Sequence, residues 1–308
     1  MRFALALPNN HHVAALVQPW EYHLGGADLA RTVRLADELG FHKVGFGEHF
    51  AIPSGQVELS GAHYLQSTTG LAFLAGHTSR LQLSSHVTLV ALQNPIVQAK
   101  MWAVLDWLSG GRAHMLVGAG WLKEEFDILR VDFDQRGRIC DEYIAAMVEL
   151  WTQDEPRFDG EFISFSDIAA EPKPVQRPHI PLWFAGDAPA SLRRVARWGR
   201  GWSPYQTPPE RFREKLENIA SHPDYHGRPV EVWFNLSMLK LGAGHHTKSN
   251  DGDLEPRNAE QLVHTLGWLG ALGVTEVTLA VPRLADFEAY LDWLRWISAD
   301  VMPKAREL

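Results

Sequence analysis

The residues best suited to chemistry follow short apolar runs along the chain. Five groups are polar or lack side chains, and in order they are Pro8-Asn9-Asn10-His11-His12, Glu48-His49, Ser85-His86-Val87, Gly118-Ala119-Gly120-Trp121 and Ala185-Gly186-Asp187. Imidazole exchanges protons near neutral pH, and glycine lets a flat ligand or another chain segment approach the backbone closely. The groups together predict a histidine-bearing binding site, although the glycines at 118 and 120 also suit a tight turn with no ligand.

Buried strands are expected to carry these groups, because each apolar run is followed by an amphipathic stretch with helical spacing. The predicted strands are 2–7, 43–47, 81–90, 113–120, 180–186, 201–202, 230–238 and 275–281, and the predicted helices are 27–40, 64–78, 96–111, 134–151, 190–199, 208–221, 258–273 and 284–298. This alternation implies parallel strands joined by right-handed crossovers, and eight such units close a TIM (β/α)8 barrel. Binding groups in such a barrel lie at the carboxyl ends of the strands, where the five groups fall.

We expect one barrel domain over 1–308, because a single α/β barrel commonly takes about 250 residues or more. Insertions are predicted at about 51–63 and 153–180, the second because Asp159-Gly160 between alternating runs signals a hairpin. An open doubly wound sheet fits less well. Neither its G-x-G-x-x-G after the first run nor a G-x-x-x-x-G-K-[ST] occurs in the sequence.

Composition argues against some classes of function. The chain has 29 Lys plus Arg against 37 Asp plus Glu and no basic run, which disfavours a nucleic-acid surface. Its apolar stretches are too short to cross a bilayer or to form a signal-peptide core, so a cytoplasmic protein without membrane contact is expected. Cys140, the only cysteine, is expected to be a small buried filler.

Several motifs in the same order resemble the bacterial luciferase-like oxidoreductase family, in its branch that uses the deazaflavin coenzyme F420. They are VGFGEHF (44–50), LSSHVTLVALQNPIVQAKMWAVLDWLSGGR (83–112), GRAHMLVGAGWLKEEF (111–126), RGRICDEYIAAMVELW (136–151) and PLWFAGDAPASLRRVARWGRGW (181–202). The likeness covers almost the whole chain. It implies an eight-stranded barrel that binds F420, or alternatively FMN, across the strand ends. The implied activity is hydride transfer between C5 of F420 and a small neutral or aromatic substrate.

The resemblance also implies roles for residues after the second and third strands. Glu48 and His49 match the acidic–histidine pair of the family and are the predicted catalytic residues, with His49 against the ring as a proton donor or acceptor. The alternative is a histidine that only hydrogen-bonds in the core. The family has a non-proline cis peptide in a strand-three bulge behind the ring, and His86–Val87, next to Ser85, is the matching bond.

At the fourth strand, the segment 118–120 matches the part of the family that lies beside the ring. Some sugar-phosphate dehydrogenases of the branch carry a catalytic glutamate directly after it, where this chain has Trp121, so their substrate and acid do not carry over. Tryptophan instead offers an apolar stacking wall. The glutamates at 124–125 could substitute as the acid, but we favour a solvated first helical turn that pairs with Arg136 or Arg138.

The segment 185–188, Ala185-Gly186-Asp187-Ala188, matches the part of the family that holds the cofactor phosphate with backbone amides. It precedes the predicted helix 190–199, and a helix start offers unpaired N–H groups and partial positive charge. Asp187 is predicted to cap that helix. We identify no cluster of basic residues suited to bind the glutamate tail of F420.

Three kinds of partner are expected. A small-molecule substrate is predicted to contact His11, His12, Trp20, His63 and Trp121, although Trp20 equally suits a packing role. A homodimer is predicted, because the helix 96–111 is apolar on more than one face through Val97, Met101, Trp102, Leu105 and Leu108. A separate reductase is expected to supply reduced cofactor.

Other functions remain open. The nearer alternative is an FMN-dependent two-component monooxygenase that uses reduced flavin and oxygen. A reduced flavin reacts with oxygen, whereas a deazaflavin carries carbon at the reacting position 5 and transfers hydride. A metal-dependent barrel hydrolase is remote, because no H-x-H follows the first run and no H-E-x-x-H occurs, and no metal is predicted. A flavin-binding protein without turnover is also compatible with the fold.

Overall fold

Eight parallel strands form a closed barrel in the computed structural model, which describes residues 1–239, 243–246 and 258–306. The barrel strands are β1 (Arg2–Leu5), β2 (Lys43–Phe46), β3 (Gln82–Ser85), β5 (Ala113–Gly118), β8 (Leu182–Ala185), β9 (Gly201–Ser203), β10 (Glu231–Asn235) and β11 (Glu276–Thr278). The pairings of β1 with β11 and of β3 with β5 close the ring. The predicted TIM (β/α)8 barrel is confirmed.

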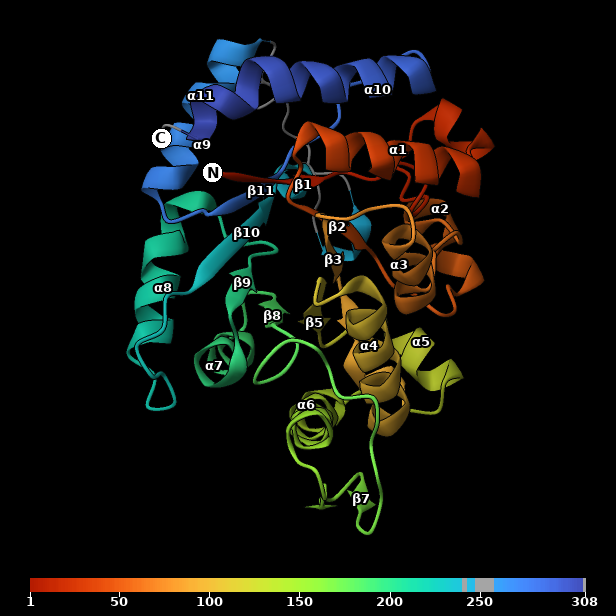
Figure 1. Ribbon diagram of the computed structural model, residues 1–308, viewed down its shortest axis with the longest axis vertical. Coiled ribbons are helices and arrows are strands. Elements are labelled where there is room, and N and C mark those ends of the chain that lie inside the picture. Colours follow the sequence, from red (N-terminus) through yellow and green to blue (C-terminus); the bar gives the residue numbers. More distant parts are fainter. Residues whose placement is uncertain (240–242, 247–257, 307–308) are drawn as a thin grey trace.

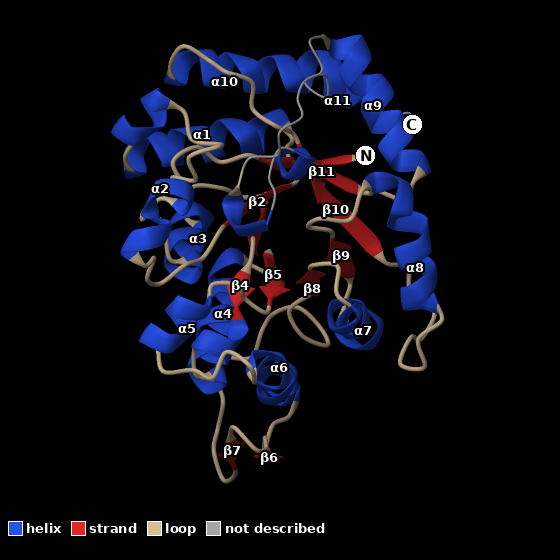
Figure 2. Cartoon of the chain, turned by 180° about the vertical axis from the view of Figure 1, so that it is seen from behind, coloured by secondary structure: helices blue, strands red, loops and turns tan. Residues whose placement is uncertain are grey.

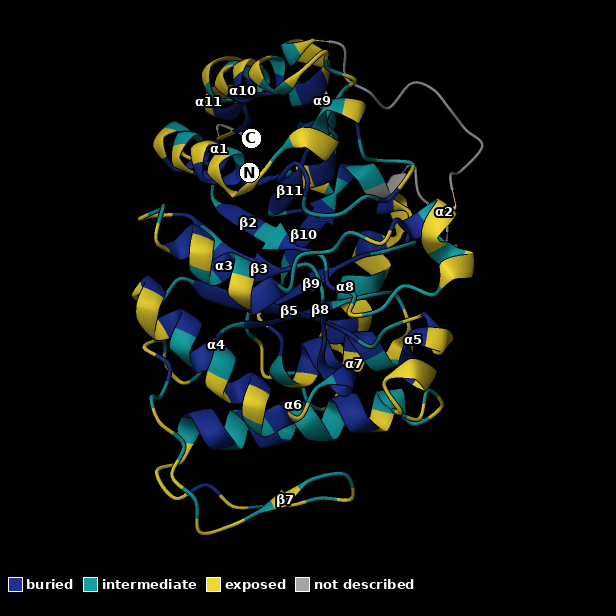
Figure 3. Ribbon diagram, turned by 90° about the vertical axis from the view of Figure 1, so that its right-hand side faces the viewer, coloured by how far each residue is buried: buried dark blue, intermediate teal, exposed yellow. Residues whose placement is uncertain are grey.

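Helices surround the strands on the outside, as Figures 1 and 2 show from opposite sides. They are α1 (Gly26–Leu39), α3 (Ser67–Ala75), α4 (Pro95–Ser109), α6 (Arg136–Thr152), α7 (Pro189–Trp198), α8 (Phe212–Ala220), α9 (Ala259–Ala271), α10 (Phe287–Trp296) and the C-terminal α11 (Met302–Arg306). Figure 3 shows buried residues on their inner faces and exposed residues outside. None of the helices in the described ranges is both long and apolar enough to cross a membrane.

Local signals explain where α4 begins and ends. The side chain of Asn94 accepts hydrogen bonds from the first-turn amides, Pro95 occupies the first position, and Gly110 ends the helix in the left-handed conformation at φ 67°. Trp102 and Leu105 are buried against the core, so the helix is not apolar all round. Val97, Trp107 and Leu108 are nevertheless exposed on it. The homodimer stays a prediction.

The third strand is interrupted. β3 ends at Ser85, and the chain pairs with the barrel again as β4 (Thr88–Leu89), which lies beside the end of β5. The predicted strand over 81–90 is therefore two strands joined by a bulge. The His86–Val87 peptide bond within the bulge is cis, which confirms the prediction.

Both predicted insertions are present. The first, about 51–63, holds a 3-10 turn (Ser54–Gln56) and the short α2 (Val57–Ser60). The second, about 153–180, contains the predicted hairpin as β6 (Phe158–Asp159) and β7 (Ser164–Phe165) and contributes no residue to the wall of the cavity described below. The short α5 (Lys123–Ile128) and the 3-10 turn Ala243–His245, part of the region between β10 and α9, lie outside the predicted elements.

A buried ion pair lies at the amino ends of the strands, away from the candidate site. Lys43 Nζ lies 2.6 Å from Glu276 Oε2 and 4.0 Å from the ring centroid of Trp183. The other carboxylate oxygen lies 2.9 Å from His42 Nε2 and 3.2 Å from Arg2 Nε. Burial opposes ionisation of Glu276, but the charge of Lys43 and the hydrogen bonds from His42 and Lys43 lower its pKa to about 2.

Cys140 is fully buried in α6, as predicted. Burial raises the pKa of its thiol to about 11, which makes the thiolate scarce at neutral pH.

Candidate functional site

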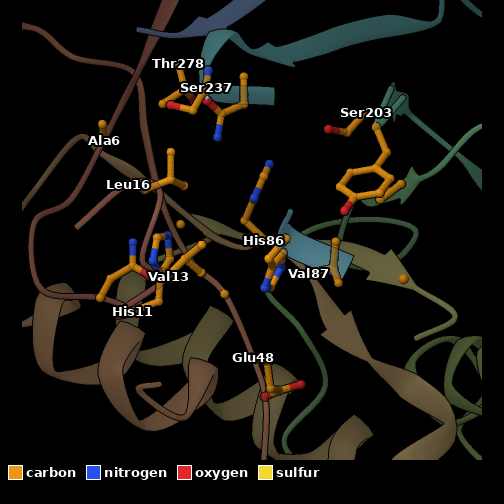
Figure 4. A pocket seen from close by; sticks show the side chains of 18 of the residues that line it. Ala6, His11, Val13, Leu16, Glu48, His86, Val87, Ser203, Ser237 and Thr278 are labelled. Atoms are coloured by element: carbon orange, nitrogen blue, oxygen red, sulfur yellow. Dashed lines mark hydrogen bonds between the residues drawn. The ribbon is translucent and has the colours of Figure 1, made fainter. Parts of the chain in front are cut away.

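A cavity of about 520 Å³ opens at the carboxyl ends of the barrel strands. Residues at or after all eight strands line it: His11 after β1, His49 after β2, His86 after β3, Gly118 at the end of β5, Gly186 after β8, Ser203 in β9, Asn235 in β10 and Thr278 in β11. Figure 4 shows His11, His86, Ser203 and Thr278 on different sides of this space. The cavity thus lies at the end of the barrel where the site is predicted.

His49 is held by a carboxylate that sequence reasoning assigned to solvent. Its Nδ1 lies 2.7 Å from Glu125 Oε2, while Glu125 Oε1 accepts hydrogen bonds from the amides of Phe50 (2.6 Å) and Ala51 (3.2 Å). Glu125 is fully buried, and only its neighbour Glu124 is exposed. The expectation of a solvated pair of glutamates is therefore wrong for Glu125.

The arginines expected to pair with these glutamates have other partners. Arg136 donates to the carbonyls of Gly120 and Phe133, and Arg138 donates to Gln135 and Glu161. The cause of the error is tertiary: α5 packs under the loop that follows β2, which turns one glutamate inward.

This pairing fixes the proton on the imidazole. A carboxylate only accepts hydrogen bonds, so Nδ1 of His49 donates to Glu125 and Nε2 is the nitrogen left to exchange a proton. The ring contacts Tyr64 at 4.8 Å and Trp121 at 6.1 Å between centroids, both edge-on. The arrangement supplies a positioned general acid or base with aromatic side chains around it.

Glu48 has a different place from His49. It accepts hydrogen bonds from the Leu89 amide at 3.1 Å and from Gln66 Nε2 at 3.4 Å, and burial raises its pKa. Figure 4 shows its carboxyl group apart from His11 and His86. Both oxygens thus join the end of β2 to neighbouring segments, which is a positioning role. A catalytic role for Glu48 stays a prediction.

The two glycines that end β5 meet protein atoms as well as the cavity. A Cβ at Gly118 would lie 2.5 Å from Val87 Cγ2, and one at Gly120 would lie 2.6 Å from Phe126 Cε2. Gly120 also has a φ of 82°. Glycine is therefore required at 118 because of the bulge and at 120 because of α5, since a side chain at either position would collide with these neighbours. Ala119 lies between them and also lines the cavity.

Of the three residues predicted around the bulge, two line the cavity and one does not. His86 and Val87 are part of its wall. Ser85 is buried and donates a hydrogen bond from Oγ to the Leu116 carbonyl at 3.0 Å, so it joins two strands. Its side chain points along the barrel wall because β3 is still paired there.

The segment 185–188 forms a cradle before α7. Gly186 has a φ of 98°, and α7 begins at Pro189, with Ala188 as its N-cap residue and no side-chain cap. Asp187 accepts hydrogen bonds from the amides of Tyr205 and Gln206 and from Thr207 Oγ1. The prediction that Asp187 caps the helix is wrong, because this carboxylate holds the loop after β9.

The cradle suits a phosphate group. An uncapped helix start presents N–H groups and partial positive charge. A Cβ at Gly186 would lie 3.2 Å from Ser191 Oγ, so the hydroxyl stands directly beside the bare backbone. Both Arg193 and Arg194 are paired with Asp141 and are not needed for this site.

The predicted substrate residues divide into two groups. His11, Trp20 and Trp121 line the cavity. His12 and His63 do not; their rings stack at 4.2 Å, and His12 Nε2 lies 2.6 Å from Asn9 Oδ1. The stacked rings of His12 and His63 support the loop that follows β1.

Residues that sequence reasoning did not place in the site include Glu125, Tyr64 and His245. Glu125 lies five residues after Gly120, but nothing in the local sequence distinguishes it from Glu124. His245 falls in a stretch without periodicity between β10 and α9, and no local signal marks it. Within the described ranges, no group of three or more potential ligand side chains could hold a metal ion.

Burial keeps several histidines of the cavity neutral. Burial, followed by the nearby histidines His245 and His86, lowers the pKa of His11 to about 4. Burial also lowers the pKa of His86 to about 4. At neutral pH these rings are therefore uncharged polar groups.

These low pKa values predict a loss of stability in acid. The unfolded chain binds protons near pH 6.5 but the folded chain only near pH 4, so each buried ring costs on the order of 3 kcal/mol as pH falls through this window. Burial raises the pKa of Glu21 and Glu48, which acts in the opposite direction. The variant His11→Phe isolates the contribution of one of these histidines. Its free energy of unfolding, measured in urea, should fall less between pH 6.5 and 4.5 than that of the unchanged protein. Parallel curves would contradict this assignment.

The luciferase-like monooxygenase family matches residues 1–246. The chain belongs to this family. The protein is accordingly an oxidoreductase with a luciferase-like barrel; an FMNH2-dependent monooxygenase is among the proteins similar in sequence, and an F420-dependent reductase is among the solved structures with the same fold.

Three comparisons show the range of sequence identity and of cofactor use among these proteins. This luciferase-like protein is 36% identical over 190 residues to an uncharacterized protein of Mycobacterium tuberculosis, covering 58% of this chain and 67% of that one. It is 30% identical over 149 residues to the FMNH2-dependent dimethylsulfone monooxygenase of Pseudomonas putida, covering 47% of this chain and 41% of the relative. The structure of the coenzyme F420-dependent tetrahydromethanopterin reductase from Methanopyrus kandleri superposes with a TM-score of 0.73 at 16% identity, covering 98% of each chain. At that identity the similarity shows the fold alone.

Proposed function

We propose that this luciferase-like protein is an F420-dependent oxidoreductase that exchanges a hydride with a small, uncharged organic substrate. The observation that carries the proposal is the His49–Glu125 pair at the wall of the cavity, 2.7 Å apart. Hydride transfer to or from a carbon that bears oxygen requires a proton to move at that oxygen. A histidine with one nitrogen fixed by a buried carboxylate is suited to move it.

The cavity fits such a cofactor. The bare segment 118–120 and the bulge 86–87 would flank a flat ring, and the cradle 185–188 with Ser191 would hold a phosphate. When bound, F420 supplies the hydride-carrying carbon. The remaining work belongs to the chain: His49 moves the proton at Nε2, Glu125 keeps that nitrogen free by binding Nδ1, and Tyr64 and Trp121 help to exclude water.

The charges around the cavity support an uncharged substrate. Among the described residues that line it, the carboxylates Glu21, Glu48 and Asp187 accept hydrogen bonds from the chain. Arg136, the arginine among the described residues of the wall, is occupied by two backbone carbonyls and the ring of Phe133. Within this described part of the wall, an anionic substrate would find no ready counter-charge and would lie close to Glu125.

A second candidate has its own support. The 30% identity to the FMNH2-dependent dimethylsulfone monooxygenase favours an FMN-dependent monooxygenase, supplied with reduced flavin by a separate reductase. The same cradle accepts the phosphate of either cofactor, and His49 could serve as the proton donor or acceptor in either reaction. The two candidates differ in the ring that is bound and in the need for oxygen.

Equilibrium binding separates the candidates. Titration of the purified protein with F420, oxidised FMN and reduced FMN under anaerobic conditions is expected to show micromolar affinity for F420 and at least tenfold weaker affinity for both forms of FMN. Spectral change of the bound cofactor is the measurement. Tighter binding of reduced FMN, with product that forms only in the presence of oxygen, would replace the first candidate by the second.

A further inference from the structure

A second histidine reaches the cavity from an unexpected part of the chain. His245 belongs to the described turn 243–246, between β10 and α9, and it lines the cavity. Its ring lies 5.3 Å from that of Trp121 and 6.3 Å from that of His49, both contacts edge-on. Gly244 and His245 have left-handed backbones, with φ of 63° and 64°. The turn thus places an imidazole beside the proposed proton-transfer group.

The insertion around α2 holds this imidazole. Ser60 Oγ lies 2.8 Å from His245 Nδ1 and accepts a hydrogen bond from Gln56 Nε2 at 2.9 Å. Gln56 Nε2 also donates to the Gly244 carbonyl at 3.2 Å. Among the described residues, His245 Nδ1 is the acceptor within reach of the Ser60 hydroxyl, so we assign the hydroxyl hydrogen to Nδ1. The proton of a neutral imidazole then resides on Nε2, which makes that atom a donor.

His245 is uncharged at neutral pH. Burial, followed by the charge of His49, lowers the pKa of His245 to about 4. Its described side-chain hydrogen-bond partner is the hydroxyl of Ser60, whereas His49 is paired with the carboxylate of Glu125. At neutral pH His245 is therefore a neutral hydrogen-bonding group.

Building on the proposed function, we propose that His245 is a specificity-determining residue that donates a hydrogen bond to the hydroxyl or carbonyl oxygen of the substrate. The substrate lies against Trp121, within reach of both imidazoles. This assigns a recognition role to the turn 243–246 and an orienting role to Ser60. It also explains selection for oxygen-bearing, uncharged molecules, because an analogue without the oxygen leaves a buried donor unpaired.

Matched ligands test the inference without turnover. Binding of benzyl alcohol, toluene and benzoate to the protein loaded with its cofactor can be measured by calorimetry. His245→Phe keeps a ring in the wall but removes the donor, so it should weaken benzyl alcohol binding about fivefold and change toluene binding less than twofold. Benzoate should bind the unchanged protein at least tenfold more weakly than benzyl alcohol.

Two further variants control the measurement. His246 is the exposed neighbour, and His246→Phe should leave all three affinities within twofold. Ser60→Ala removes the anchor but keeps the imidazole, so it should weaken benzyl alcohol binding by less than His245→Phe does. Cofactor affinity should change less than twofold in every variant.

Several outcomes would overturn the role of His245. Equal effects of His245→Phe on toluene and benzyl alcohol would reduce it to a packing residue. An unchanged affinity for benzyl alcohol, or preferential binding of benzoate, would remove it from recognition. If benzyl alcohol binding depends on His245 but no hydride exchange is detected with F420, the proposed function alone fails.

Discussion

Replacing His49 by alanine is expected to lower turnover by about a hundredfold or more while cofactor affinity stays within a few-fold. The reason is that His49 is the imidazole of the cavity that pairs with a buried carboxylate, Glu125, at 2.7 Å. Loss of a positioned general acid or base typically costs this much. Steady-state kinetics with F420 and titration of the same cofactor provide the two measurements.

Two variants sharpen this test. Glu125→Gln keeps the size of the side chain but removes the carboxylate, so it should lower kcat and shift the pH profile of the remaining activity with little change in cofactor affinity. His63→Ala removes a histidine that stacks on His12 outside the cavity wall and should change turnover less than threefold. Activity of His49→Ala close to that of the unchanged protein would exclude His49 from proton transfer.

Replacing Lys43 by alanine is expected to destabilise the barrel by about 3–5 kcal/mol, because it leaves Glu276 without its fully buried counter-charge. The change also removes the ammonium group between the rings of Trp183 and Trp233, which it contacts at 4.0 Å and 4.7 Å. Urea unfolding at pH 7 gives the free energy, and the melting temperature should fall by roughly 5 °C.

An exposed ion pair supplies the matched control. Lys123 and Asp127 lie one helical turn apart, 2.7 Å between charged atoms, and both are more than half exposed. Lys123→Ala should change the unfolding free energy by less than about 0.5 kcal/mol. The double variant Lys43→Met with Glu276→Gln should recover part of the lost stability, since it removes both buried charges. If Lys43→Ala and Lys123→Ala lower the free energy of unfolding equally, burial does not increase the cost of breaking the Lys43–Glu276 ion pair.

Periodicity predicted the barrel because its physical causes are local. α4 was placed within two residues at each end, since Asn94, Pro95 and Gly110 act on the adjacent backbone. The short strands were found because each is a buried apolar run between turn residues. The interruption of β3 at His86–Val87 was predicted by the resemblance to the family. Periodicity alone predicts one continuous strand from 81 to 90.

Part of the candidate site could be predicted because the positions of the strands depend on local sequence. Residues at strand ends, such as His49, His86 and Gly186, follow from the barrel once the strands are known. Residues on excursions do not, because the path of an excursion depends on what it packs against. Asp187 illustrates this: its neighbours in sequence suggest a helix cap, but its partners are in the segment 205–207.

By itself the sequence determined the eight-fold alternation of strands and helices and the end of the barrel where the cavity opens, and its resemblance to the family made His49 the predicted proton-transfer residue. Only the tertiary structure decided which carboxylate reaches that histidine, why Gly118 and Gly120 lack side chains, and that His245 joins the cavity. Alternation and turn chemistry act between neighbours in the chain. The pairing of His49 with Glu125, 76 positions apart, depends on how two separate loops pack over the same barrel end.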